Sequence, residues 1–203
     1  DTLPADDWAR VPCRFDVIGL NFEAGTQKLT QDDAPGIVAG ATVDRILLTS
    51  RGANYRAGTI RELEKAGYVL PQPLGEPTHG TMWRWTDERH PDKRTYPLSY
   101  DRGVFMTTGA NKGRVLLHLL DERGLQYDHV ILADDGRRNI DNMQAALADR
   151  GIGYHGLWYT RIDKTVTPEK AAEGRHAWTA WRALLQSVYP DRWARLEKNE
   201  CFN

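Results

Sequence analysis

Two adjacent carboxylates, Asp134 and Asp135, occupy the part of this sequence that is best suited to chemistry. The apolar run Val130-Ile131-Leu132-Ala133 comes directly before them and is typical of a strand buried on both faces of a parallel sheet. Ligands of open α/β sheets bind outside the carboxyl ends of the strands, where paired carboxylates are costly unless a cation or hydrogen-bond donors compensate them. Mg²⁺, which takes few carboxylates together with phosphate oxygens and water, suits this position. The alternative is that one of the two aspartates caps the following helix.

Two other loops carry side chains that suit the same chemistry. The strand expected over 43–48 leads into Thr49-Ser50-Arg51-Gly52, whose hydroxyls and backbone N–H groups either hold phosphate or form a hydroxyl-rich turn. Lys112 stands at a predicted helix start, where a cation is unfavourable because the helix dipole is positive there. An anionic group nearby would relieve this, so we expect Lys112 to meet the Asp134–Asp135 pair. The alternative is a solvated surface lysine.

Apolar runs alternate with helical stripes along the chain, which is the pattern of an α/β fold. The pattern predicts a mainly parallel sheet with helices on both faces. Strands are expected near 43–48, 103–107, 129–133 and 154–160, and helices near 54–66, 114–123, 140–148 and 167–188. The stretch Arg14–Phe22 has strand length and is expected as a further strand.

Residues 69–99 differ from the rest of the chain because they hold many prolines and charges. The composition predicts an irregular insertion or β-hairpin that crosses the mouth of the sheet. Trp83, Trp85 and His79 would either touch a substrate there or, as is more common, anchor the insertion to the domain.

Length and composition set limits on the class of protein. The 203 residues suit a single domain over 1–203, and a net charge of −1 gives no basic field for nucleic acid. No apolar run is long enough to span a membrane. No signal peptide is visible, so a cytoplasmic and an exported location both stay open. Cys13 and Cys201 form either a disulfide or two free thiols.

Taken together, the three loops resemble the haloacid-dehalogenase (HAD) superfamily of phosphotransferases, and more closely an uncharacterised bacterial, acid-phosphatase-like group within it. The resemblance covers about residues 29–159. Its motifs are Leu47-Leu48-Thr49-Ser50-Arg51-Gly52, then Asn111-Lys112-Gly113 before a leucine-rich helix, and then Val130-Ile131-Leu132-Ala133-Asp134-Asp135 followed by Asn139. The order and spacing of these motifs are more specific than any one of them.

The resemblance implies a HAD-like, Rossmann-type fold and a Mg²⁺-dependent phosphomonoester hydrolase that works through an aspartyl-phosphate intermediate. Thr49, with Ser50, would bind the transferring phosphoryl group, and Lys112 would neutralise its charge. Asp135 would hold Mg²⁺ with support from Asp134. The substrate would be a phosphorylated small molecule or a phosphoprotein.

One motif of the family is incomplete in this chain. The first motif, Asp-x-Asp-x-Thr, carries the nucleophile and the general acid/base at the end of a central strand. Asp1-Thr2-Leu3 matches only its tail, which would place both aspartates upstream of Asp1. A second alignment makes Asp16 the nucleophile on the Arg14–Phe22 strand, with Ile18 in place of the acid. Under the second alignment, 14–22 would lie beside 43–48 and 129–133.

A non-catalytic HAD-like protein that binds a partner or a phosphorylated ligand is therefore the alternative to the enzyme. A domain of the flavodoxin or response-regulator type also pairs acidic residues with a lysine. It is disfavoured because here the Thr-Ser-Arg loop precedes Lys112 and the acidic pair comes last.

Overall fold

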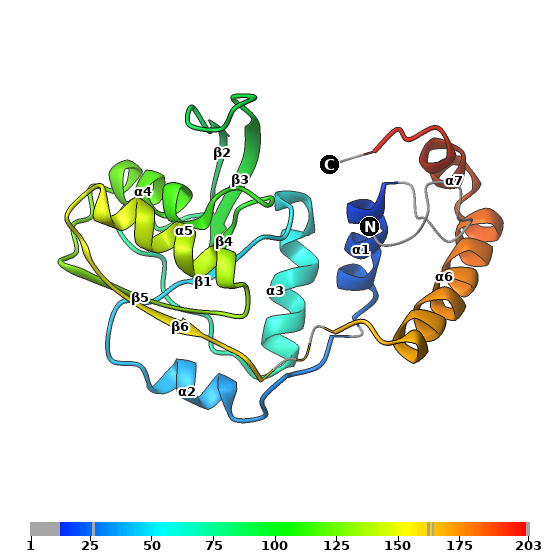
Figure 1. The fold of residues 1–203 in the computed structure, drawn as a ribbon, viewed down its shortest axis with the longest axis horizontal. Helices are drawn as coiled ribbons and strands as arrows, with labels where there is room; N and C mark the ends of the chain where they lie inside the picture. The colour runs from blue at the N-terminus through cyan, green and yellow to red at the C-terminus, as the bar shows by residue number, and fades with distance from the viewer. Residues whose placement is uncertain (1–12, 26, 162, 164, 202–203) are drawn as a thin grey trace. The chain divides into compact units, whose positions relative to one another are not determined.

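A computed structural model describes residues 13–25, 27–161, 163 and 165–201 of the chain. The chain divides into two compact units, Phe22–Ile162 and a second unit made of Asp1–Asn21 with Asp163–Asn203 (Figure 1). Each unit has a hydrophobic core of its own. A single domain over residues 1–203 stays a prediction.

The unit Phe22–Ile162 confirms the predicted alternation of helices and strands. Its elements are α2 (Ala34–Gly40), β1 (Leu47–Thr49), the 3₁₀ turn η1 (Ala53–Tyr55), α3 (Arg56–Lys65), β2 (Thr81–Thr86), β3 (Thr95–Asp101), β4 (Val104–Met106), α4 (Lys112–Glu122), β5 (His129–Asp134), α5 (Arg137–Ala148) and β6 (Gly153–Trp158).

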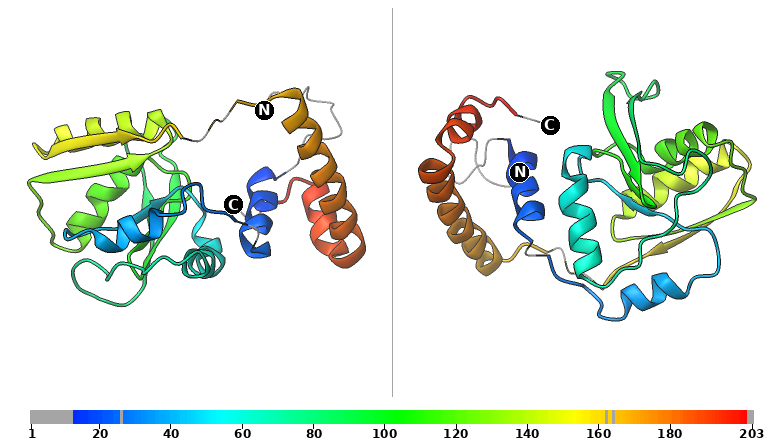
Figure 2. Two further views of the ribbon diagram at one scale, coloured as in Figure 1. Left: turned by 90° about the horizontal axis from the view of Figure 1, so that it is seen from below. Right: turned by 180° about the vertical axis from the view of Figure 1, so that it is seen from behind.

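The strands of this unit form two sheets among the described residues, one in the order β1-β4-β3-β2 and one of β5 and β6 (Figures 1 and 2). β1 pairs with β4 and β5 pairs with β6 in parallel, whereas β3 runs antiparallel to both β4 and β2. The prediction that 43–48 and 129–133 share one mainly parallel sheet is therefore wrong. The larger sheet is mixed because the chain between β2 and β4 turns back twice, and β5 makes no ladder with β1.

Helices cover both faces of the larger sheet, as predicted. Phe105 of β4 packs in one core cluster with Val115 and Leu119 of α4, while its neighbours Val104 and Met106 pack in another with Ile60 of α3. This alternation follows from the period of two in a strand, which sends successive side chains to opposite faces. Leu116 and Leu120, on another side of α4, pack with Leu132 of β5, so α4 contributes to the cores of both sheets.

The predicted insertion at 69–99 contains β2 and most of β3, and this hairpin extends the sheet at β4 instead of crossing its mouth. Trp83 lies edge-on to Phe105 at 6.2 Å and to His118 of α4 at 5.6 Å between ring centroids. Trp85 lies 6.1 Å from the same histidine ring. The two tryptophans therefore anchor the hairpin to α4, which is the commoner of the two expected roles. His79 is exposed in the loop before β2.

The packing of His118 predicts a pH dependence of stability. Burial lowers the pKa of His118 below its ordinary value of 6.5, while Glu122 and Asp121 act in the opposite direction. The neutral imidazole is thus favoured in the folded state. Its contribution to the free energy of unfolding is present above pH 6.5 and is lost as the pH falls through the lowered pKa. We expect the free energy of unfolding to fall between pH 7.5 and 5.5 by a larger amount in the unaltered chain than in His118→Phe. An equal fall in both chains would contradict this role.

The second unit is helical. It contains most of α1 (Arg14–Ala24) together with α6 (Pro168–Val188) and α7 (Pro190–Glu197). Its core consists of Val17, Trp178, Leu185 and Leu196. A disulfide joins Cys13 to Cys201 across 188 positions of sequence, which decides between the two expected states of these cysteines.

The strand predicted over Arg14–Phe22 is wrong, because this stretch is helix α1. Asp16 lies in that helix with 1% of its surface exposed. The alignment that made Asp16 a nucleophile on a strand between 43–48 and 129–133 is therefore wrong as well. Among the described residues, no helix is both long and apolar enough to cross a membrane.

Candidate active site

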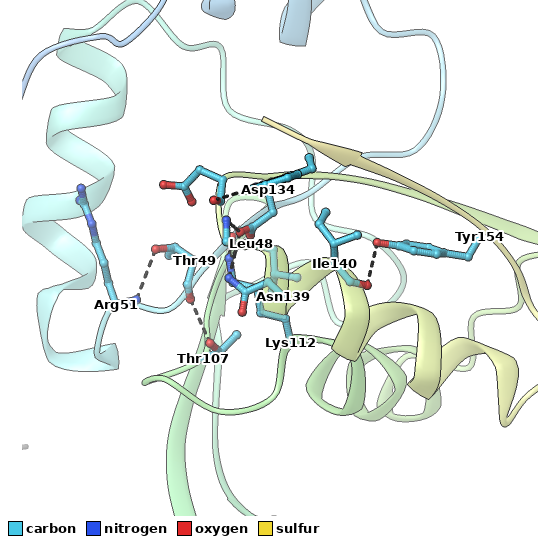
Figure 3. Close-up of polar contacts among 12 residues, drawn as sticks. Leu48, Thr49, Arg51, Thr107, Lys112, Asp134, Asn139, Ile140 and Tyr154 are labelled. Carbon is cyan, nitrogen blue, oxygen red and sulfur yellow. Dashed lines mark hydrogen bonds and ion pairs between the residues drawn. The ribbon is translucent and has the colours of Figure 1, made fainter. Parts of the chain in front are cut away.

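The carboxyl ends of β1, β4 and β5 bring together the loops that the sequence singled out (Figure 3). The end of β4 is tied to the end of β1, because Thr107 donates to the Thr49 carbonyl from both its backbone N–H (2.9 Å) and its hydroxyl (3.1 Å). The end of β1 is linked to β5 by a side chain, not by a strand ladder.

That side chain is Lys112, the first residue of α4. Its Nζ donates to Asp134 Oδ2 at 2.6 Å and to the Leu48 carbonyl at 3.2 Å. Only 7% of the lysine side chain and 6% of the aspartate side chain are exposed. The predicted approach of Lys112 to the acidic pair is confirmed, and the counter-charge explains how a cation is tolerated at the start of a helix.

Asp134 is held by three donors. Besides Lys112, its Oδ1 accepts hydrogen bonds from the backbone N–H of Gly136 at 2.7 Å and from Asn139 Nδ2 at 2.9 Å. Burial alone would raise the pKa of Asp134, but these hydrogen bonds and the lysine charge outweigh it and hold the pKa below its ordinary value of 3.8. Asp134 is therefore ionised at neutral pH and fixes the position of the lysine amine.

The close approach of α4 and α5 positions these groups (Figure 2). Gly113, the residue after Lys112, lies so near α5 that a Cβ atom there would come within 2.6 Å of the Asn142 carbonyl oxygen. Only a glycine allows this contact without movement of the backbone. Asn111 caps the helix by accepting from the Arg114 N–H at 3.1 Å. These features bring Lys112 to Asp134, the same carboxylate to which Asn139 of α5 donates.

Thr49 and Ser50 stand at the end of β1. Thr49 Oγ1 accepts from the Arg51 N–H at 3.3 Å, which leaves the hydroxyl able to donate its own hydrogen. Ser50 is exposed. The Arg51 side chain turns away toward α3, where it donates to Thr59 Oγ1 at 3.2 Å and stacks 3.9 Å from the centroid of the Phe22 ring. Arg51 therefore holds the loop in place at the end of β1.

Asp135 is the remaining member of the acidic pair and is half-buried. Asp134 accepts hydrogen bonds from Lys112, Gly136 and Asn139, and Asp135 is the carboxylate that the resemblance assigns to a cation. Mg²⁺ uses one or two carboxylates with phosphate oxygens and water, and Asp135 fits as one such ligand. In the described part of the chain, the only group of three close metal-ligating side chains is Cys13, Asp16 and Cys201, whose cysteines form the disulfide.

A family model described as "Protein of unknown function (DUF2608)" matches residues 2–189, which is most of the chain. The chain belongs to this family. No curated protein and no solved structure matches this DUF2608 chain. The roles of its residues therefore depend on the geometry of the site.

The sequence identified the side chains of this DUF2608 site better than its backbone groups. Lys112, Asp134 and Asn139 belong to the quoted motifs, and the structure brings them together with the end of the Thr49 strand. The Leu48 carbonyl and the Gly136 N–H were missed. The glycine directly after the acidic pair was the available signal, because it leaves the backbone free to turn toward Asp134.

Proposed function

We propose that this protein is a HAD-like, Mg²⁺-dependent phosphomonoester hydrolase whose site is formed by the loops after β1, β4 and β5. The observation that carries the proposal is the buried ion pair of Lys112 and Asp134, 2.6 Å apart at the carboxyl ends of β1 and β5. A fixed amine at the strand ends is suited to hold the negative charge of a transferring phosphoryl group, because phosphoryl transfer depends chiefly on positioning and charge neutralisation.

Each residue of the site has a separate part in this proposal. Lys112 holds a positive charge at a fixed point, and Asp134 positions it. The hydroxyls of Thr49 and Ser50 donate to phosphoryl oxygens. Asp135 would hold Mg²⁺, which when bound withdraws charge from the phosphate. The substrate class is a phosphomonoester, either a small molecule or a phosphoprotein.

The proposal assigns the nucleophile of the reaction to none of the described residues. Asp16 does not supply it, because this residue is buried in α1. The resemblance implies a pair of first-motif aspartates as nucleophile and general acid/base. The alternative function, a non-catalytic protein that binds a phosphorylated ligand or partner, is favoured if no such aspartates exist.

The disulfide bears on where the protein works. Disulfides persist in oxidising compartments and are rare in reducing ones. The bond between Cys13 and Cys201 therefore supports the exported alternative over the cytoplasmic one.

Asp135→Ala is the variant that tests the proposal. The natural chain, including any sequence that precedes Asp1, is expected to hydrolyse p-nitrophenyl phosphate only with Mg²⁺. Loss of the cation ligand should lower the rate by about 10²-fold or more. The matched control is Asp92→Ala in the β2–β3 turn, where the carboxylate is 87% exposed, and it should keep full activity.

Full activity of Asp135→Ala would contradict the assigned role. Phosphate binding without hydrolysis in the unaltered chain would favour the non-catalytic alternative.

A further inference from the structure

Three side chains of the helical unit lie close enough together to hold one metal ion. The sulfurs of Cys13 and Cys201 and one carboxylate oxygen of Asp16 all lie within 4.8 Å of one another. None of these residues belongs to the loops of the proposed hydrolase. In the oxidised chain the two sulfurs form the disulfide, so the group can hold an ion only after this bond is reduced.

The start of α1 places two of the three side chains next to each other. Cys13 directly precedes the helix, and its carbonyl accepts hydrogen bonds from the N–H groups of Asp16 at 2.8 Å and Val17 at 3.3 Å. Residues three positions apart lie on the same side of a helical turn, which makes the sulfur and the carboxylate neighbours. Val17 is buried in the core of the unit and so fixes this turn.

The turn after α7 brings the third side chain to the same place. Leu196 of α7 is fully buried and packs in the core with Val17. Beyond it, Asn199 has a φ of 55°, and its N–H donates to the Leu196 carbonyl at 3.0 Å. The Cα atoms of Cys13 and Cys201 lie 5.2 Å apart. The core and the turn therefore help to hold the two cysteines near each other, in addition to the bond between them.

The types of ligand and their spacing favour Zn²⁺. Soft thiolates select zinc over hard cations such as Mg²⁺, and a carboxylate oxygen is a common further ligand of zinc. Because Zn–S bonds are about 2.3 Å and Zn–O bonds about 2.0–2.2 Å long, the ligand atoms of a tetrahedral ion lie about 3.5–3.8 Å apart. The three side chains therefore need only small movements to bind one ion. Asp16 is 1% exposed, whereas Cys201 is exposed and leaves the fourth position open to water.

The charge of this group also suits the start of a helix. Two thiolates and one carboxylate carry one more negative charge than Zn²⁺ neutralises. The first turn of a helix stabilises negative charge, and α1 begins at these ligands.

From this convergence we propose that the helical unit, when its disulfide is reduced, binds one Zn²⁺ ion through Cys13, Cys201 and Asp16. A dithiol reductant supplies two electrons and two protons, which convert the disulfide into two thiols while the dithiol becomes a disulfide. Zn²⁺ then displaces the two thiol protons to water as the two Zn–S bonds form. The ion and the disulfide are thus alternative cross-links between the same two segments of the unit.

This inference goes beyond the proposed hydrolase, because the ion would bind whether or not the protein is an enzyme. In an oxidising compartment the chain carries the disulfide. In a reducing compartment Zn²⁺ would hold the same two segments together.

The test uses the chain of residues 1–203, reduced with a phosphine without oxygen, freed of the phosphine, and titrated with Co²⁺ and then Zn²⁺. One equivalent of Co²⁺, a coloured substitute for zinc, is expected to give a thiolate-to-cobalt absorption band and the d–d bands of a tetrahedral ion. Zn²⁺ should abolish both, and the oxidised chain should show neither. Zn²⁺ should also raise the unfolding midpoint of the reduced chain, because an ion that binds the folded state stabilises it.

A matched pair of variants tests the carboxylate. Asp16→Asn should weaken Zn²⁺ binding by more than the roughly 10-fold that loss of a group outside the ligand shell commonly costs. Glu200→Gln, which changes an exposed carboxylate next to Cys201, should bind as the unaltered chain does. If Asp16→Asn does not fold, X-ray absorption of the zinc-loaded unaltered chain decides the question. Two sulfurs at about 2.3 Å and two oxygens at about 2.0–2.2 Å are expected.

Four results would overturn the proposal. These are no binding of Co²⁺ by the reduced chain, equal binding by the oxidised chain, equal Zn²⁺ affinities of Asp16→Asn and the unaltered chain, and a zinc ion surrounded by four sulfurs, which two chains would have to share.

Discussion

Lys112→Met is expected to lower the free energy of unfolding by about 3–5 kcal/mol, the usual cost of removing one partner from a buried ion pair. Asp134 would keep its bonds from Gly136 and Asn139 but would lose the lysine charge in a site where 6% of its side chain is exposed. The Leu48 carbonyl would lose its donor as well. Urea unfolding of both chains at neutral pH measures the difference. A loss below about 1 kcal/mol would mean that the pair behaves as a surface salt bridge.

The double variant Lys112→Met with Asp134→Leu separates the cost of an unpaired charge from that of lost packing. Removing both charges should restore much of the stability, because a buried ion pair can be replaced by apolar groups at little net cost. A double variant no more stable than Lys112→Met would contradict this explanation.

The ion pair of Lys112 and Asp134 also predicts that the free energy of unfolding depends on pH in the acid range. The folded-state pKa of Asp134 lies below its ordinary value of 3.8, so the contribution of the pair is fully present above that pH and is lost as the pH falls through the lowered pKa. Between pH 5 and 2, the free energy of unfolding should therefore fall less in Lys112→Met than in the unaltered chain.

Loss of the disulfide is expected to have the second large effect on stability, in the helical unit. Replacing Cys13 and Cys201 together with serine should destabilise the helical unit by about 2–5 kcal/mol, because the unfolded chain would no longer be closed into a loop. Trp178 and Trp193, whose rings lie 6.3 Å apart in this unit, provide a fluorescence signal for its unfolding.

Reductant provides the control. It should lower the unfolding midpoint of the unaltered chain and leave the double-serine variant unchanged. Equal midpoints for the reduced and oxidised chains would show that the bond does not support the unit.

Local signals predicted most of the candidate site. Apolar stripes predict the helices that carry Lys112 and Asn139, and an apolar run predicts the strand that ends at Asp134. Each of these elements can therefore be predicted from its own stretch of sequence. Their meeting at one place follows from the rule that sites form at the carboxyl ends of strands.

The Arg14–Phe22 stretch shows where local signals mislead. Its apolar run has the length of a strand, which favoured a strand. In the structure Val17 packs in the core with Cys13 and Leu20, at helical spacing, while Phe15 is 61% exposed. The core that selects the helix comes from α6 and α7, more than 150 positions away in sequence, and no local pattern contains it.

The division into two sheets was also beyond local reasoning. The runs at 43–48 and 129–133 are both typical of parallel strands, and nothing in either shows whether they touch. Their separation into two sheets depends on the strands that each pairs with, β4 and β6, which lie outside both runs. The disulfide could not be predicted either, because the number of residues between two cysteines does not tell whether they lie close together in the fold.

Binding of orthovanadate, a mimic of the transferring phosphoryl group, tests the candidate site most directly because it requires no turnover. Titration of the natural chain, followed by ⁵¹V NMR, is expected to show binding that requires Mg²⁺. Asp135→Asn should abolish this binding, and Asp92→Asn, which changes an exposed carboxylate in the hairpin, should leave it intact. Unchanged, Mg²⁺-dependent binding to Asp135→Asn would contradict the placement of a phosphate and cation site at the ends of β1 and β5.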